Sequence, residues 1–393
     1  MEIFRDEARN LFNLMVEIRR DMHAHPEVDR NLTYTAALVE KHLKENGITY
    51  KRFPNNGIIA DIGTEKNKII ALRADMDALT VQDMKTVPYK STVPGMMHAC
   101  GHDAHTAILI AAGIILKKAE SQLNGTVRLI FQPAEETDGG AQDMIEYGCL
   151  ENVEAVIGLH VDEAINTGEV ALKKGLVCAA SNPFNIKVTG KGSHGASPQD
   201  GVDAIVTSAK IVENLQTVVS RETSPVKNAV ITIGTINGGT ALNAISSSVE
   251  MTGILRTVGD DLRNFCKERM TSIIEQTANM MRGTAEINFV DGYPSFENDS
   301  SLAEFFIELA DSLNNVSLKE IDYPSMGVED FAYYTKRVPG LYYKLGCRSE
   351  EKGIKNPAHG GYFDIDEECM IVGCMLQSMF AYKLLNRRSR NGN

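Results

Sequence analysis

Short apolar runs and helical repeats alternate along the first 180 residues of the chain. The apolar runs predict strands that are buried on both faces, at residues 58–62, 68–74, 126–132 and 154–160. Apolar side chains at helical spacing predict helices, at residues 7–22, 33–46, 104–119 and 139–147. This alternation predicts an α/β domain with a mixed, largely parallel sheet and helices on both of its faces.

The pattern changes near Pro183. Six elements follow in the order strand, helix, strand, strand, helix, strand, at residues 184–188, 202–216, 230–236, 247–255, 260–281 and 286–289. This is the order of a ferredoxin-like α+β module. The chain then returns to a helix, a strand and a last helix, at residues 301–313, 341–345 and 366–385. We therefore expect a catalytic domain made of residues 1–181 and 297–393, with an inserted domain at residues 182–296.

Composition and charge narrow the function classes. The 393 residues, 43% of them hydrophobic, are enough for a large core and two domains. The net charge of −12 argues against nucleic acid or an anionic membrane surface as a partner. We find no apolar run long enough to span a bilayer and no signal peptide at the N-terminus. The seven cysteines form an odd set without paired spacing, so we expect free thiols in a reducing cytoplasm.

Residues 96–106 concentrate the side chains that bind metals. They read Met-Met-His-Ala-Cys-Gly-His-Asp-Ala-His-Thr, and only a glycine separates Cys100 from His102. Thiolate, imidazole and carboxylate together suit a divalent ion such as zinc, manganese, cobalt or nickel. The alternative is a polar turn that contains a buried free cysteine. A metal site requires further ligands elsewhere in the chain.

Further candidate ligands stand at predicted strand ends or in the loops after them. Glu136 follows the strand at 126–132, His160 ends the strand at 154–160, and His359 lies in a loop rich in proline and glycine. Ligands collect at this edge of α/β sheets. With Cys100 and His102 these make five protein ligands, which are too many for one open tetrahedral site and suit two ions that share a bridging ligand.

The adjacent pair Glu135-Glu136 suggests a division of labour. Neighbouring side chains diverge, so both carboxylates are not expected to bind one ion equivalently. One can bind metal while the other accepts a proton from the attacking water. By itself the pair would also suit a solvated helix start, where acidic residues are favoured.

Four motifs together resemble a known superfamily. They read Arg-Ala-Asp-Met-Asp-Ala-Leu at 73–79, His-Ala-Cys-Gly-His-Asp at 98–103, Gln-Pro-Ala-Glu-Glu at 132–136 and Gly-Ser-His-Gly-Ala-Ser-Pro at 192–198. They resemble the aminoacylase/carboxypeptidase metallopeptidase superfamily, in its amidohydrolase branch of hippurate hydrolases, N-acetyl-diaminopimelate deacetylases and auxin-conjugate hydrolases. The similarity extends over nearly the whole chain.

The resemblance implies roles for particular residues. It implies a two-metal site, manganese or zinc first and cobalt or nickel next, held by Cys100, His102, Glu136, His160 and His359. It implies that Glu135 is the general base, that His194 contacts the scissile carbonyl, and that Asn243 and Arg256 hold the carboxylate of the substrate. Guanidinium grips carboxylate in a bidentate fork, which suits Arg256. After Asn243 this chain reads Ala-Ile-Ser-Ser where related peptidase branches often have Ile-Pro-Asp, which puts the shape of that loop in doubt.

These observations lead to one expected function and two alternatives. We expect metal-dependent hydrolysis of the amide bond of small N-acyl-L-amino acids. The resemblance implies that the inserted domain is a lid or dimerisation domain, in a homodimer or possibly a homotetramer. A dipeptidase or aminopeptidase on the same site is the first alternative. A non-catalytic binding protein that has kept the fold is the second.

Overall fold

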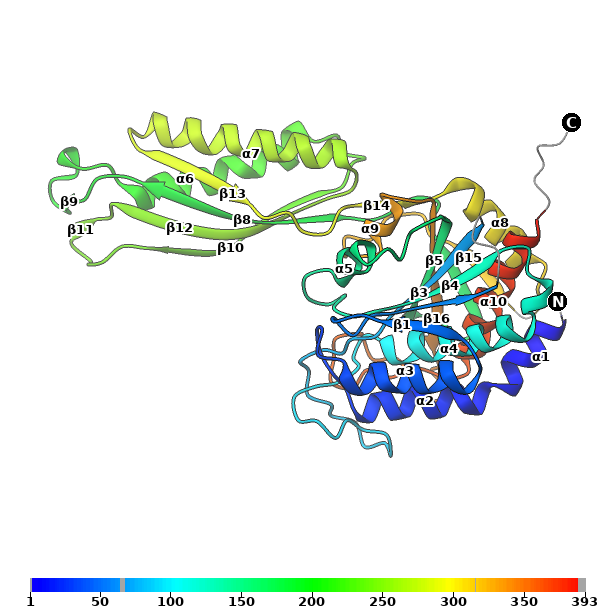
Figure 1. Cartoon of the computed structure of the whole chain (residues 1–393). Helices are drawn as coiled ribbons and strands as arrows, with labels where there is room; N and C mark the ends of the chain where they lie inside the picture. Colours follow the sequence, from blue (N-terminus) through cyan, green and yellow to red (C-terminus); the bar gives the residue numbers. More distant parts are fainter. Residues whose placement is uncertain (1, 64–67, 315, 388–393) are drawn as a thin grey trace, which may run out of the picture. The chain divides into compact units, whose positions relative to one another are not determined.

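The computed structural model describes residues 2–63, 68–314 and 316–387, which form two compact units (Figure 1). The first unit comprises residues 1–175, 297–322 and 333–393, and the second comprises residues 176–296 and 323–332. Each unit has its own hydrophobic core.

The first unit is built on an eight-stranded sheet with the order β1-β2-β4-β3-β5-β16-β6-β15. The four strands at its centre, β4, β3, β5 and β16, run parallel to one another, whereas β1, β2 and β6 join by antiparallel pairing. The strands are β1 (Thr49–Arg52), β2 (Ile58–Ile62), β3 (Ile69–Asp75), β4 (Thr126–Gln132), β5 (Val153–Asn166), β6 (Glu169–Leu172), β15 (Ser317–Glu320) and β16 (Gly340–Arg348). The prediction of a mixed, largely parallel sheet is confirmed.

Helices cover both faces of this sheet (Figure 1). They are α1 (Glu2–Asn10), α2 (Phe12–Ala24), α3 (Thr33–Glu45), α4 (His102–Lys118), α5 (Gly140–Glu146), α8 (Ser300–Asp311), α9 (Ala332–Thr335) and α10 (Cys369–Asn386). Every residue of α4 from His102 to Leu116 is buried, as the strongly apolar sequence after its first turn predicts. Side chains of α2, α3, α4, α8 and α10 form one core with the strands, while α5 lies on the other face.

Several predicted elements have different limits in the structure. The helix expected at 7–22 is two helices, α1 and α2, interrupted at Leu11. The strand expected to end at His160 continues to Asn166, because β16 pairs with it beyond that point. The edge strands β1 and β15 were missed because their largely exposed sequences lack an apolar run, and β6 was missed because it is only four residues long.

Helix α10 also corrects the expectation about membrane spans. By length and composition it could cross a bilayer, contrary to our sequence-based statement that no run is long enough. In the structure 72% of this segment is buried inside the protein. A helix that is apolar on all sides and covered by protein is typical of a core helix.

The second unit contains the predicted ferredoxin-like module. Its four-stranded sheet has the order β10-β12-β8-β13, and all three pairings are antiparallel. The elements are β8 (Ala180–Thr189), α6 (Ala204–Thr217), β10 (Ala229–Gly238), β12 (Ser248–Thr257), α7 (Asp260–Met280) and β13 (Thr284–Phe289). Two short strands, β9 (Ser193–His194) and β11 (Ala244–Ile245), pair with each other at one end of this sheet. Helices α6 and α7 bury the apolar side of the strands, as alternate burial along β8 shows.

Candidate metal centre

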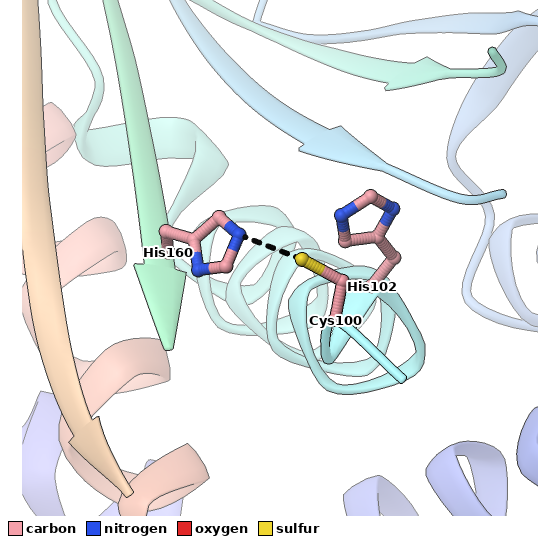
Figure 2. A group of neighbouring side chains, drawn as sticks. All are labelled: Cys100, His102 and His160. Atoms are coloured by element: carbon pink, nitrogen blue, oxygen red, sulfur yellow. Dashed lines mark hydrogen bonds between the residues drawn. The ribbon is translucent and has the colours of Figure 1, made fainter. Parts of the chain in front are cut away.

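Cys100, His102 and His160 turn towards one another in the first unit (Figure 2). Their ligand atoms all lie within 4.8 Å of each other, and the Cys100 Sγ is 3.3 Å from the His160 Nε2. Gly101, which lies between the first two, has φ = +87° and directly precedes α4. A Cβ at this position would stand 2.3 Å from the Cγ2 of Val161, so only glycine fits the turn.

Strand register explains how His160 reaches this group. Strands β3 and β5 pair in parallel with Arg73 beside Gly158, so His160 is level with the last residue of β3, Asp75. The His160 Nδ1 donates a hydrogen bond to the Val161 carbonyl at 2.6 Å. This contact leaves its Nε2 as an acceptor facing Cys100.

Glu136 and His359 form a second group with Cys100. Their ligand atoms again lie within 4.8 Å of one another, and the His359 Nε2 is 3.5 Å from the Glu136 Oε1. The His359 backbone N–H donates to the Ala99 carbonyl at 2.8 Å, which fixes its loop beside the Cys100 turn. His359 has φ = +61°, a left-handed conformation that non-glycine residues rarely adopt. The structure thus gathers all five predicted ligands, and Cys100 belongs to both groups.

Glu135 lies next to this centre through the turn after β4. Its carboxylate forms a further group with the carboxylate of Glu136 and the ring of His102. The carboxylate of Asp77 accepts the backbone N–H groups of both Glu135 and Glu136, at 3.1 Å each. One buried aspartate therefore holds both neighbouring glutamates in place.

Asp75 and His105 orient the histidines from behind. The His105 Nδ1 donates to the Asp75 Oδ1 at 2.6 Å, while its Nε2 accepts the backbone N–H of Val161 at 2.9 Å. This arrangement requires neutral His105, in agreement with the lowering of its pKa by burial. His105 is consequently a support for the strand that carries His160.

The donor set fits a divalent cation. Both ring nitrogens of His102 and the Oε1 of Glu136 are buried without a hydrogen-bond partner among the described residues. Such groups normally have partners, because an unsatisfied buried polar atom costs about 1–3 kcal/mol. Burial raises the pKa of the Cys100 thiol and that of the Glu136 carboxyl, which opposes their charged forms unless a cation is close. Burial lowers the pKa of His102, but Asp75, Asp77 and Cys100 together outweigh burial and raise it well above the ordinary value.

A second buried polar cluster lies beside the first turn of α4. The Asp103 Oδ2 accepts from the Arg19 Nε at 3.0 Å and from the His23 Nδ1 at 2.7 Å, and Lys85 contacts the other ring nitrogen of His23. These contacts make His23 a structural residue. The sequence did not predict the cluster, because its members are far apart in the chain, from Arg19 to Asp364.

The second unit separates the predicted substrate-binding residues. His194 and Asn243 lie together: His194 pairs with Ala244, and the Gly195 N–H donates to the Asn243 carbonyl at 2.7 Å. Arg256 stands near the far end of β12, where its Nη1 donates to the Met326 carbonyl at 2.8 Å. The eight steps of strand from Ser248 to Arg256 span about 27 Å at ~3.4 Å per residue. Within one chain, Arg256 and Asn243 do not reach the same carboxylate.

One charged residue beside the centre was overlooked. Lys344 interrupts the apolar sequence of β16, and its Cα is directly paired with that of His160. The signal was available, since a lysine inside an otherwise buried strand is uncommon.

Comparisons with known proteins agree with this geometry. A model of peptidase family M20/M25/M40 matches residues 71–381. IAA-amino acid hydrolase ILR1-like 4 of Arabidopsis thaliana is 37% identical over 96% of this chain and 87% of its own length. N-acetyl-L-cysteine deacetylase of Bacillus subtilis is 38% identical over 95% and 88%. A dinuclear metal-binding peptidase of family M20 from Bacillus subtilis superposes with a TM-score of 0.86, at 32% identity over 96% of this chain and 99% of that one.

Proposed function

Because the chain belongs to peptidase family M20/M25/M40, a family of hydrolases, we propose that it cleaves the amide bond of N-acyl-L-amino acids. The observation that carries the proposal is the convergence of five metal-binding side chains beside Glu135. Relatives whose names describe IAA-amino acid hydrolysis and N-acetylcysteine deacetylation support an acylated amino acid as the substrate. The products would be a carboxylate and a free amino acid.

Two divalent ions fit the donor set. Cys100, His102, Glu136, His160 and His359 would hold them, since each belongs to at least one group of neighbouring ligand atoms. A solved relative described as dinuclear supports this number. Bound ions of this kind lower the pKa of water and polarise a carbonyl. Manganese or zinc suits thiolate, imidazole and carboxylate, followed by cobalt or nickel.

Glu135 would carry the proton of the reaction. Its side chain is 8% exposed and lies beside the ligand group, so an incoming water can reach the carboxylate while bulk solvent is mostly excluded. It would accept a proton from the attacking water and return it to the leaving nitrogen. Asp77 would fix the backbone of Glu135 during both transfers.

Residues of the inserted domain would bind the rest of the substrate. His194 accepts the Ala196 N–H at its Nδ1, at 3.1 Å, which leaves the Nε2 proton free for the oxygen of the acyl group. Arg256 would grip the α-carboxylate of the amino acid. About 27 Å of β12 lies between Arg256 and Ser248, and His194 and Asn243 belong to the short strand pair beyond Ser248 and its loop. We infer that His194 and Asn243 serve the site of a partner subunit, in a homodimer or homotetramer.

We assign the catalytic role and the role of lid to separate domains. Residues 1–181 and 297–393 would form the catalytic domain, and residues 182–296 would form the lid and the subunit contact. A cytoplasmic location is part of the proposal, because all seven cysteines are free and buried.

A reconstitution assay tests the proposal. The protein is stripped with a chelator, reloaded separately with manganese, zinc, cobalt or nickel, and offered N-acetyl and N-benzoyl amino acids beside unblocked dipeptides. We expect metal-restored cleavage of the acylated substrates. Glu135→Gln keeps the size of the side chain and should bind metal normally, with turnover reduced about 10²–10⁴-fold.

The other outcomes are equally clear. Preference for dipeptides would identify a peptidase. Metal binding without cleavage of any substrate would favour a binding protein. Full activity of Glu135→Gln would remove this residue from the mechanism.

A further inference from the structure

Lys344 lies beside the candidate metal centre on the same face of the sheet as His160. Parallel strands β16 and β5 pair Lys344 with His160. Residues paired in this way project to the same face of a sheet. The neighbours Tyr343 and Leu345 point to the opposite face and pack in the core. The lysine is therefore not part of the core but of the face that carries a candidate ligand.

The Lys344 ammonium has no acidic partner in the described part of the chain. On its other side β16 pairs it with Ala171, which has no polar group in its side chain. Its Nζ lies 5.9 Å from the centre of the Tyr342 ring, a contact that is weak for a cation. The carboxylate of Asp162, two residues beyond His160, accepts the Ala164 N–H at 2.9 Å.

Lys344 is also close enough to act electrostatically on the centre. Neighbouring strands lie about 4.8 Å apart, so the base of the Lys344 side chain stands directly beside that of His160. The half-buried ammonium of Lys344 is repelled by the positive charge of two divalent ions bound at the centre. An anionic group placed between Lys344 and the ions would relieve this repulsion.

We propose that Lys344 binds a second carboxylate of the substrate, so that the enzyme prefers N-acyl amino acids that carry an additional anionic group. This proposal rests on the function proposed above and narrows its substrate class. The α-carboxylate is assigned to Arg256, so the group at Lys344 is a different one. A neutral residue at position 344 would accept uncharged substrates without this preference.

Two parts of a substrate could supply the second carboxylate. One is the side chain of an acidic amino acid, and the other is the free end of a dicarboxylic acyl group. Matched pairs of substrates distinguish them. N-acetyl-L-glutamate with N-acetyl-L-glutamine tests the side chain, and N-succinyl-L-alanine with N-succinamoyl-L-alanine tests the acyl end. Within each pair the size is similar and one negative charge differs.

The experiment compares the manganese-loaded wild-type enzyme with Lys344→Met and Lys344→Arg. Methionine is unbranched and of similar length to lysine but uncharged, and arginine keeps the charge. In one of the two pairs, Lys344→Met should reduce the ratio of kcat/KM for the anionic substrate to that for the neutral substrate by about tenfold or more. Lys344→Arg should restore at least part of this ratio. A ratio that changes by less than threefold in both pairs would overturn the proposal.

A binding measurement separates this proposal from the proposed function. Calorimetry with succinate and with butyrate, on the same metal-loaded proteins, measures recognition of the second carboxylate without turnover. Wild type should bind succinate more tightly than butyrate, and Lys344→Met should lose that preference. An enzyme that cleaves acyl amino acids yet shows no such preference would refute the role of Lys344 alone. Absence of all cleavage, with the preference for succinate intact, would refute only the proposed function.

Discussion

Replacing His98 by phenylalanine should make the protein less sensitive to acid. The His98 ring is 1% exposed, and neither of its nitrogens has a hydrogen-bond partner among the described residues. Burial is the main reason that its pKa falls to about 3, with His23 and His102 lowering it further and Asp103 and Asp77 acting against them. The folded protein thus holds a neutral imidazole in a place that does not accommodate an imidazolium.

The sign and size of the effect follow from proton binding. Below about pH 6.5 the unfolded chain binds a proton at His98, whereas the folded state stays neutral at this residue down to about pH 3. The stability associated with neutral His98 is therefore complete above about pH 6.5 and is lost as the pH falls towards 3. At ~1.4 kcal/mol per pH unit, the loss between pH 7 and pH 5 is about 2 kcal/mol.

Urea unfolding followed by circular dichroism measures this loss, since the chain has no tryptophan for fluorescence. Wild type and His98→Phe are compared at pH 7, 6 and 5, with substitution of the half-exposed His25 as a control. The difference in unfolding free energy between wild type and His98→Phe should shift by about 2 kcal/mol in favour of the variant on acidification. Parallel pH dependence of the two proteins would refute the reasoning.

Two further predictions concern the geometry of the centre. Gly101→Ala places a side chain at a left-handed backbone position and against Val161, so metal affinity should fall at least tenfold. Gly353 also has positive φ but lies in open space, so Gly353→Ala should keep the metal affinity of the wild type. Metal titration measures both, and unchanged affinity in Gly101→Ala would contradict the assigned turn. Mixing Glu135→Gln with His194→Ala subunits should restore about a quarter of wild-type activity if His194 acts across a two-fold dimer. No recovery would mean that His194 acts within its own chain.

Apolar runs predicted the central strands well. β2 and β4 have the limits expected from the sequence, because glycine or proline stands directly outside both ends of each run. The same topology explains why distant ligands meet. β3 and β5 pair in parallel, so the turn that carries Cys100 and the strand that carries His160 reach one edge.

Pairing between strands was harder to predict than the strands themselves. The end of β5 depends on β16, which lies some 180 residues further along the chain, and no local pattern reveals this extension. A lysine within an apolar strand marks Lys344 as unusual in the sequence, but only the register places it beside His160. The separation of Arg256 from Asn243 depends on the length of β12, which the sequence underestimated by two residues at its C-terminal end.

The burial of α4 from His102 to Leu116 has an evolutionary consequence. Its apolar residues from Ala104 to Leu116 pack in the core without help from the side chains at the metal centre. The ligands are attached at its N-terminal end and at strand edges around it. Mutations at these positions can therefore alter or abolish chemistry while the scaffold persists. Such a lineage can explore new ion preferences, or survive as a protein without activity, before selection acts on its fold.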